Sequence, residues 1–252
     1  TNNLLGDASW QGVGCNNMTG AGIYIKKGMV DHTIIANNGA YAPGGGSSSG
    51  AGLGIMELTG PVCVDACLIC GNVASGSGGG IEASTGSSIE IRNTTIAGNK
   101  SSGAGAGLRT SNSGLKLVNS IVTGNKKGEE ADDVNGSTSS SSSNNIVGEK
   151  VAFVDAENGD YHLAKGSPAV GKGIGYDGIG VDLDGNAFVA TPSIGCYERM
   201  TADPTFAPSV KRFYPSTEVT LACATEGATI YYTTDGTAPT DGSANAFSPL
   251  KA

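Results

Sequence analysis

The heptapeptide HTIIANN at His32–Asn38 is the first of four related stretches, followed by ACLICGN (66–72), NTTIAGN (93–99) and NSIVTGN (119–125). Each stretch ends in Asn and carries Ile or Val three residues earlier. The final residues Asn38, Asn72, Asn99 and Asn125 are spaced 34, 27 and 26 residues apart. One unit of this length cannot bury its apolar face alone, so such a period indicates a solenoid of stacked repeats.

Apolar and polar residues alternate upstream of each final Asn. Two residues lie ten and eight positions before each final Asn. These pairs are Gly28/Val30, Val62/Val64, Ile89/Ile91 and Leu115/Leu117, and all but Gly28 have apolar side chains. The residues between them are Met29, Cys63, Glu90 and Lys116. This alternation predicts a strand with one buried face. A further strand opens each repeat, with Ile23, Leu53, Ile81 and Leu108 inward and Tyr24, Gly54, Glu82 and Arg109 outward.

Two or three short strands per repeat, with no amphipathic helical pattern, indicate an all-β fold. We predict a right-handed parallel β-helix over residues 1–150. Asn tolerates left-handed backbone at a sharp corner, and stacked Asn side chains form hydrogen-bonded ladders. We therefore expect the four final Asn to line up in one ladder. The acidic run Glu129–Asp133, followed by Ser139–Ser143, is expected to be a solvated loop.

Composition narrows the classes of protein to which the chain can belong. Its 252 residues suffice for one or two domains, and Gly, at 41 residues, is more than twice as frequent as usual. A net charge of −8 argues against nucleic-acid partners, which need a basic face. No apolar run approaches the roughly 18 residues of a membrane span. Because the chain begins at Thr1 within repeat-like sequence, we expect a processed, monomeric piece of a longer protein.

The repeat ends near residue 150, and a different pattern follows. Its pieces are SPAV (167–170), DLDGN (182–186) and IGCYE (194–198). In this order they resemble the choice-of-anchor Q type region that closes many secreted bacterial β-helices of the pectin-lyase-like class. The resemblance implies an irregular C-terminal cap over residues 151–200. A solenoid needs such a cover over its last apolar coil, and we expect the segment at that end.

The C-terminal part has a third composition, with the phrase GATIYYTTDGTAPT at 227–240. It resembles the immunoglobulin-like module at the C-terminus of chitobiase and β-hexosaminidase enzymes, which is also appended to many Bacteroidetes surface proteins. The resemblance implies an accessory β-sandwich over residues 201–252. Such a sandwich usually needs about 100 residues, so we expect an incomplete module. It also implies a protein that is secreted or lies on the extracellular face of the outer membrane.

Two stretches have the residue types of metal sites. Cys63, Cys67 and Cys70 are spaced like iron–sulfur ligands, but Cys67 and Cys70 take the places of small residues in other repeats and Cys63 points the other way. We expect buried free thiols at Cys67 and Cys70 and no metal cofactor.

The second stretch begins like a calcium loop, with Asp182 and Asp184. The twelfth position of an EF-hand would fall on Ser193 instead of Glu. An irregular Ca²⁺ site with Asp177 or Glu198 is left open beside the simpler interpretation, side chains that bind their own loop amides.

The outward columns supply the best candidate groove. Tyr24, Glu82 and Arg109 follow one strand column, and Arg92 follows the next with Asp31 and Asp65. Arg binds carboxylates through paired hydrogen bonds, so Arg92 and Arg109 could meet an acidic glycan beside the ring of Tyr24. The alternative is structural, with Arg109 paired to Glu82 and Arg92 to Asp65.

Two classes of function agree with this pattern. The first is a secreted or cell-surface protein that binds glycans or mediates adhesion without catalysis. The second is a polysaccharide lyase or glycoside hydrolase of the β-helix type that acts on acidic polysaccharide. A fold does not decide between them, because function resides in the site. The lack of a convergent acid–base set favours the first class.

Overall fold

The computed structural model describes residues 4–5, 20–42, 46–84, 88–111, 113–175, 180–199, 205–207, 219–223, 230–233 and 246–247. The chain forms two compact units, Thr1–Arg199 and Met200–Ala252. No helix among the described residues is long and apolar enough to cross a membrane.

The first unit is a parallel β-solenoid built from four sheets. They are numbered in the order in which the chain passes through them from β2 onward. Sheet 1 consists of β2 (Ile23–Ile25), β6 (Leu53–Ile55), β10 (Ile81–Ala83), β14 (Leu108–Thr110) and β19 (Val134–Asn135). Sheet 2 consists of β3 (Gly28–Asp31), β7 (Val62–Asp65), β11 (Ile89–Arg92) and β15 (Lys116–Val118). Sheet 3 consists of β4 (Ile34–Ala36), β8 (Leu68–Cys70), β12 (Thr95–Ala97), β16 (Ile121–Thr123) and β20 (Ile146–Val147). Sheet 4 consists of β1 (Leu4–Leu5), β5 (Gly39–Ala40), β9 (Val73–Ala74), β13 (Lys100–Ser101), β17 (Lys126–Lys127) and β18 (Glu130–Ala131).

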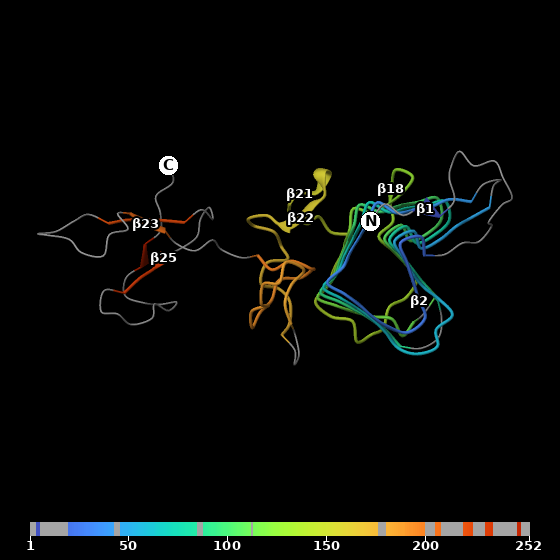
Figure 1. Ribbon diagram of the computed structural model, residues 1–252, viewed down its shortest axis with the longest axis horizontal. Helices are drawn as coiled ribbons and strands as arrows, with labels where there is room; N and C mark the ends of the chain where they lie inside the picture. The colour runs from blue at the N-terminus through green and yellow to red at the C-terminus, as the bar shows by residue number, and fades with distance from the viewer. Residues whose placement is uncertain are drawn as a thin grey trace, which may run out of the picture. The chain divides into compact units, whose positions relative to one another are not determined.

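Each strand pairs with its counterpart one coil later, so the coils superimpose when viewed along the axis (Figure 1). The predicted register is confirmed: Glu82 pairs with Arg109, and Ile91 lies between Val64 and Leu117. A complete coil contains four strands, where the repeat predicted two or three, because the two-residue strands of sheet 4 are too short to show an alternation.

Aliphatic columns from sheets 1, 2 and 3 meet inside the solenoid and form its core. The core residues without solvent exposure include Leu53, Ile55, Ile69, Ile81, Ile91 and Leu108. Cys67 belongs to this core, in the small column that also contains Thr94 and Ser120.

The four final Asn form a continuous ladder at the corner between sheets 3 and 4. Each rung donates from its side-chain amide to the Oδ1 of the next rung at 2.9 Å, from Asn38 to Asn72, Asn99 and Asn125. The left-handed backbone expected at these Asn lies one residue earlier, at Asn37, Gly71, Gly98 and Gly124. The ladder Asn instead point inward, because their side chains also donate to core carbonyls such as that of Ile69.

The acidic run after β17 is only partly the solvated loop that its composition predicts: Glu129 and Glu130 are exposed, whereas Asp133 is buried and belongs to this framework. Asp133 accepts from the backbone and side-chain amides of Asn125 at 2.9 and 2.8 Å and thereby ends the ladder. Just before it, β18 pairs antiparallel with β17. The hairpin therefore covers the last edge of sheet 4.

Residues 151–199, which we call the flank segment, contain β21 (Phe153–Asp155), the 3₁₀ turn η2 (Ala156–Asn158) and β22 (Asp160–Leu163). We expected this segment over the end of the solenoid, but its contacts run along sheet 3 (Figure 1). Tyr161, Cys196 and Tyr197 pack on the outward side chains of Leu68 and Ala97. The physical reason is that sheet 3 carries small and apolar residues on both faces, so its outer face needs a cover.

The flank segment reaches from the first coil to the last. His32 Nε2 lies 3.0 Å from the carbonyl oxygen of Val181, and the amide of Cys196 donates to Thr95. Asn119 exchanges two hydrogen bonds of 2.9 Å with the backbone of Ile174.

The second unit contains two antiparallel strand pairs among its described residues. β23 (Thr205–Ala207) pairs with β24 (Thr220–Ala222), and β25 (Ile230–Tyr231) pairs with β26 (Ala246–Phe247). This pairing agrees with the predicted antiparallel β module.

Candidate functional site

The outer face of sheet 2 carries both acidic and basic side chains. Its two outward columns are Met29, Cys63, Glu90 and Lys116, and Asp31, Asp65, Arg92 and Val118. Strand alternation explains this placement, because the residues between them, such as Ile89 and Ile91, are fully buried in the core.

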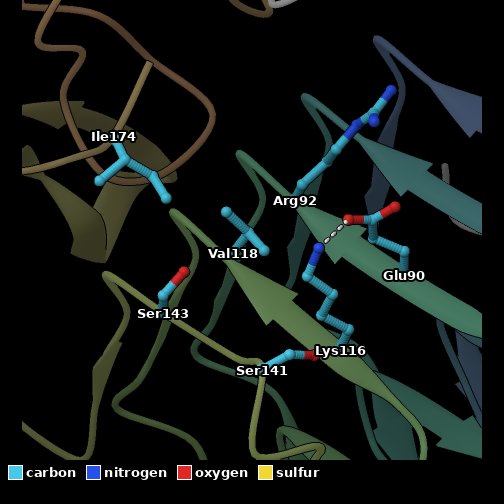
Figure 2. Close-up of a pocket in the computed structure, with 7 residues that line it drawn as sticks. All are labelled: Glu90, Arg92, Lys116, Val118, Ser141, Ser143 and Ile174. Carbon is cyan, nitrogen blue, oxygen red and sulfur yellow. Dashed lines mark hydrogen bonds and ion pairs between the residues drawn. The ribbon is translucent and has the colours of Figure 1, made fainter. Parts of the chain in front are cut away.

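A hollow of about 280 Å³ lies on this face at the last two coils (Figure 2). It is lined by Glu90, Arg92, Lys116, Val118, Ser141, Ser143 and Ile174. Lys116 Nζ lies 3.0 Å from Glu90 Oε1, and both side chains remain partly exposed to solvent. Val118 and Ile174 provide an aliphatic wall opposite this ion pair.

Two sets of hydrogen bonds fix the walls of the hollow. The amide of Ser143 donates to the carbonyl of Leu117 at 3.0 Å, which holds residues 139–143 along the edge of β15. The paired hydrogen bonds between Asn119 and Ile174 hold the flank segment at the other side. Three segments that are distant in the sequence therefore meet at one rigid surface.

Arg92 contributes to the hollow, but its guanidinium is engaged with the preceding coil. Its Nε donates to Asp65 Oδ2 at 2.8 Å, and Asn93 donates to the other oxygen of Asp65 at 3.0 Å. Figure 2 shows the guanidinium of Arg92 directed away from the Lys116–Glu90 pair. Arg92 therefore links two coils.

The predicted residues of sheet 1 lie apart from this hollow. Arg109 NH1 forms an ion pair with Glu82 Oε1, as the structural alternative expected. The Glu82 side chain is only 5% exposed, and its Oε2 has no hydrogen-bond partner among the described residues. Burial raises the pKa of Glu82, and the nearby Arg109 only partly offsets that effect. The sequence therefore predicted this pairing only as one of two alternatives, while the burial of the Glu82 carboxylate became visible only in the structure.

Tyr24 lies three strands away from Arg109, with Gly54 and Glu82 between them in the register. Its ring has the Lys26 ammonium 5.8 Å from its centre, and Lys26 forms an ion pair with Glu57. Desolvation and the Glu57 carboxylate raise the pKa of Tyr24. The four predicted ligand-binding residues therefore do not form one site: Glu82 and Arg109 meet, and Tyr24 and Arg92 lie elsewhere.

In the calcium-like stretch, the carboxylate of Asp182 accepts hydrogen bonds from backbone amides of the flank segment. Both oxygens of Asp182 accept from the chain: Oδ1 from the amides of Asp184 and Asn186, and Oδ2 from the amide of Glu198 at 2.9 Å. Glu198 in turn accepts from the amide and hydroxyl of Ser193. These donors use the lone pairs that a Ca²⁺ ion would need, which supports the interpretation as a structural loop. Asp177 lies outside the described residues.

The three closely spaced cysteines do not converge on one point. Cys67 is buried in the solenoid core, Cys70 is buried beneath the flank segment, and Cys63 lies on the outer face of sheet 2. Burial raises the pKa of Cys67 to about 12 and that of Cys70 to about 11. Cys67 and Cys70 are free thiols, and the raised pKa values keep both protonated at neutral pH.

A histidine cluster in the flank segment was not anticipated from the sequence. His162 Nδ1 lies 2.6 Å from Asp160 Oδ1, and its Nε2 lies 2.8 Å from Asp184 Oδ2. The imidazole stacks on Tyr197 with ring centres 3.9 Å apart. Partial burial lowers the pKa of His162, but the two carboxylates outweigh burial, so the net shift is upward.

Apart from Arg92, the residues that line the sheet 2 hollow were also missed, although one signal was present. Glu90 and Lys116 occupy the same outward column one coil apart, so their charges are adjacent in the stacked repeat. Ser141, Ser143 and Ile174 come from segments without a repeat, and no sequence pattern places them there.

Comparison with known proteins gives one finding for the C-terminal unit. Residues 210–251 match the family model of the chitobiase/beta-hexosaminidase C-terminal domain. Searches of the curated proteins and of the solved structures returned no significant match. The match agrees with the resemblance carried by residues 227–240 and indicates that this part of the chain is similar to a domain of carbohydrate-active enzymes.

Proposed function

We propose that this protein binds a glycan without catalysis, as a secreted or cell-surface protein, and that the sheet 2 hollow holds one sugar unit. The observation that carries the proposal is the lining of the hollow, which combines an ion pair, two serines and an aliphatic wall. The match of residues 210–251 to a domain of carbohydrate-active enzymes supports the choice of ligand class.

The lining suits the chemistry of a sugar ring. Glu90 accepts hydrogen bonds, Lys116 donates them, and the hydroxyls of Ser141 and Ser143 do both. Sugar hydroxyls need such mixed partners, while the C–H face of the ring packs on apolar side chains such as Val118 and Ile174. Because hydrogen bonds to the backbone of Ser143 and Ile174 fix the walls of the hollow, little ordering is needed when a ligand binds.

The charges favour a sugar unit that carries no strong charge of its own. Lys116 is neutralised by Glu90, and the Arg92 guanidinium is paired with Asp65. An acidic glycan would have to compete with these carboxylates for the cations. We therefore expect an Arg92→Ala/Arg109→Ala variant to change glycan binding little but to lose stability, mainly because Arg109→Ala leaves the buried Glu82 carboxylate without its cation.

Catalysis is the second class, and its requirements differ. Glycoside hydrolysis needs two carboxylates at a defined separation. Among the described residues that line the hollow, Glu90 is the one carboxylate, and it is paired with Lys116. This lining supports the binding function over hydrolysis.

The test compares two double variants that each remove a cross-coil ion pair. Glu90→Gln/Lys116→Met changes the hollow, and Lys26→Met/Glu57→Gln changes an exposed pair elsewhere. Glycan-array profiles and titration calorimetry on the full chain should show about tenfold weaker binding for the first variant, or about 1.4 kcal/mol, and unchanged binding for the second. Identical profiles for the wild type and the first variant would contradict the proposal. Release of unsaturated or reducing ends from a bound polysaccharide would establish the enzymatic alternative.

A further inference from the structure

Three lysines gather where sheet 4 reaches its last coil. Lys100 in β13 and Lys126 in β17 are partners in the parallel register, and Lys127 follows directly. All three residues are exposed. Partners in neighbouring strands lie about 4.8 Å apart, and like charges at that separation destabilise a sheet. An acidic protein of net charge −8 thus concentrates positive charge at one place on its surface.

A hollow of about 450 Å³ opens beside these lysines. Lys100, Lys127 and the exposed Ser102 line it, with Val73 and Ala74 as an apolar floor. No carboxylate belongs to the described lining of this hollow, and neither Lys100 nor Lys127 forms an ion pair with a described residue.

The nearby acidic residues compensate only part of this charge. Lys126 Nζ lies 3.5 Å from Glu129, whose side chain is almost fully exposed, and Glu130 is the antiparallel register partner of Lys127. Both glutamates belong to the hairpin and lie outside the lining of the hollow. The cations that face the hollow are therefore available to an external anion.

We propose that this hollow binds an oxyanion, a sulfate or carboxylate group carried by an acidic polysaccharide. An ammonium acts as a point charge that accepts an oxyanion from many directions, and Ser102 adds a hydroxyl donor. Val73 and Ala74 offer a surface for the carbon skeleton to which the anion is attached. The site lies on a different sheet from the sheet 2 hollow, and the inference stands whether or not that hollow binds sugar.

The experiment compares two double variants of the full chain, and each variant removes two positive charges. Lys100→Gln/Lys127→Gln changes the site, and Lys27→Gln/Lys172→Gln is the control, because those two lysines are exposed and lie outside the hollow. Both variants lower the net charge equally. Binding to dextran sulfate, polygalacturonate and uncharged dextran is measured by affinity electrophoresis and calorimetry at two salt concentrations.

We expect the wild type to bind at least one acidic polymer and not to bind uncharged dextran. The Lys100/Lys127 variant should bind about fivefold more weakly, with a shallower salt dependence, and the control should bind like the wild type. Tighter binding to dextran sulfate would identify sulfate as the group that the hollow binds, and tighter binding to polygalacturonate would identify carboxylate. Equal losses in both variants, or no binding of the wild type to either acidic polymer, would overturn the inference.

Discussion

At the scale of single residues, the Asn ladder shows how one side chain satisfies several buried groups. Asn99 accepts from the backbone and side-chain amides of Asn72, and it donates to Asn125 and to the carbonyl of Ile69. It has no solvent exposure, so none of these partners can turn to water instead. Asn fits this position because one planar group supplies both an acceptor and two donors.

Replacement of an inner rung should therefore be costly. We expect Asn99→Ala to lower the free energy of unfolding by about 3–5 kcal/mol, because several buried donors and acceptors lose their partner. The matched control is Asp133→Asn at the end of the ladder, where an amide oxygen can replace the carboxylate as acceptor from Asn125. Urea unfolding measures both variants. A loss below about 1 kcal/mol for Asn99→Ala would show that the ladder contributes little.

The His162 cluster predicts a pH dependence of stability. The pKa of His162 is raised in the folded protein, so Asp160 and Asp184 stabilise the fold fully only below the ordinary pKa near 6.5, and the stabilisation is lost as pH rises through the raised pKa. The stacked Tyr197 stays uncharged, because burial raises its pKa as well. The melting-temperature difference between the wild type and His162→Gln should be largest near pH 5.5 and shrink toward pH 8.5, in scans at constant salt. A constant difference would exclude this role.

At the scale of elements, sheet 3 packs against other parts of the chain on both of its faces. Its inward residues, such as Ile69 and Ile96, belong to the solenoid core, and its outward residues, such as Leu68 and Ile121, pack beneath the flank segment. The outward column runs Ile34, Leu68, Thr95 and Ile121 in register. Ile121 is fully buried, whereas Ile34 at the first coil is 46% exposed.

This contrast gives a matched pair of substitutions. Ile121→Ala should cost about 2–4 kcal/mol, because the flank segment closes over this side chain and a cavity remains, although the residue points away from the solenoid interior. Ile34→Ala on the same face should cost less than about 1 kcal/mol. Chemical unfolding of the two variants tests the difference. Equal costs would mean that the flank segment does not shield sheet 3.

Sequence reasoning was most successful where one coil repeats another. The alternation of residues such as Glu90 between Ile89 and Ile91 specified the faces of sheet 2 and the partners of each strand. It failed at contacts between non-repeating segments, because no periodicity relates Ile174 to Asn119, which lies 55 residues earlier. The same limit explains why the place of the flank segment, and of Ser141, Ser143 and Ile174 in the lining of the hollow, was not predicted.

At the scale of the whole molecule, the chain divides after Arg199 into two compact units. The ladder, the core and the cover of sheet 3 all belong to the first unit. Both proposed binding surfaces belong to it as well.

Truncation should reveal this division. A chain that ends at Arg199 is expected to keep the melting transition of the first unit, because the ladder, the core and the cover of sheet 3 all lie within it. A chain that ends at Lys150 should aggregate, because the outward face with Leu68, Ala97 and Ile121 loses its cover. Scanning calorimetry and light scattering compare the two truncations. A marked drop in the first transition after removal of residues 200–252 would show that the units depend on each other.

The end of the ladder at Asp133 has a consequence for how the solenoid can be lengthened by additional coils. The side-chain amide of every rung donates to the Oδ1 of the rung that follows, so all hydrogen bonds of the ladder have the same direction and its two ends differ. A carboxylate accepts but does not donate, so Asp133 acts as a terminator, and any coil copied upstream of it inherits a complete set of partners. Duplication of a single 26-residue interval would then lengthen the rod by one strand spacing, about 4.8 Å, with its terminus unchanged.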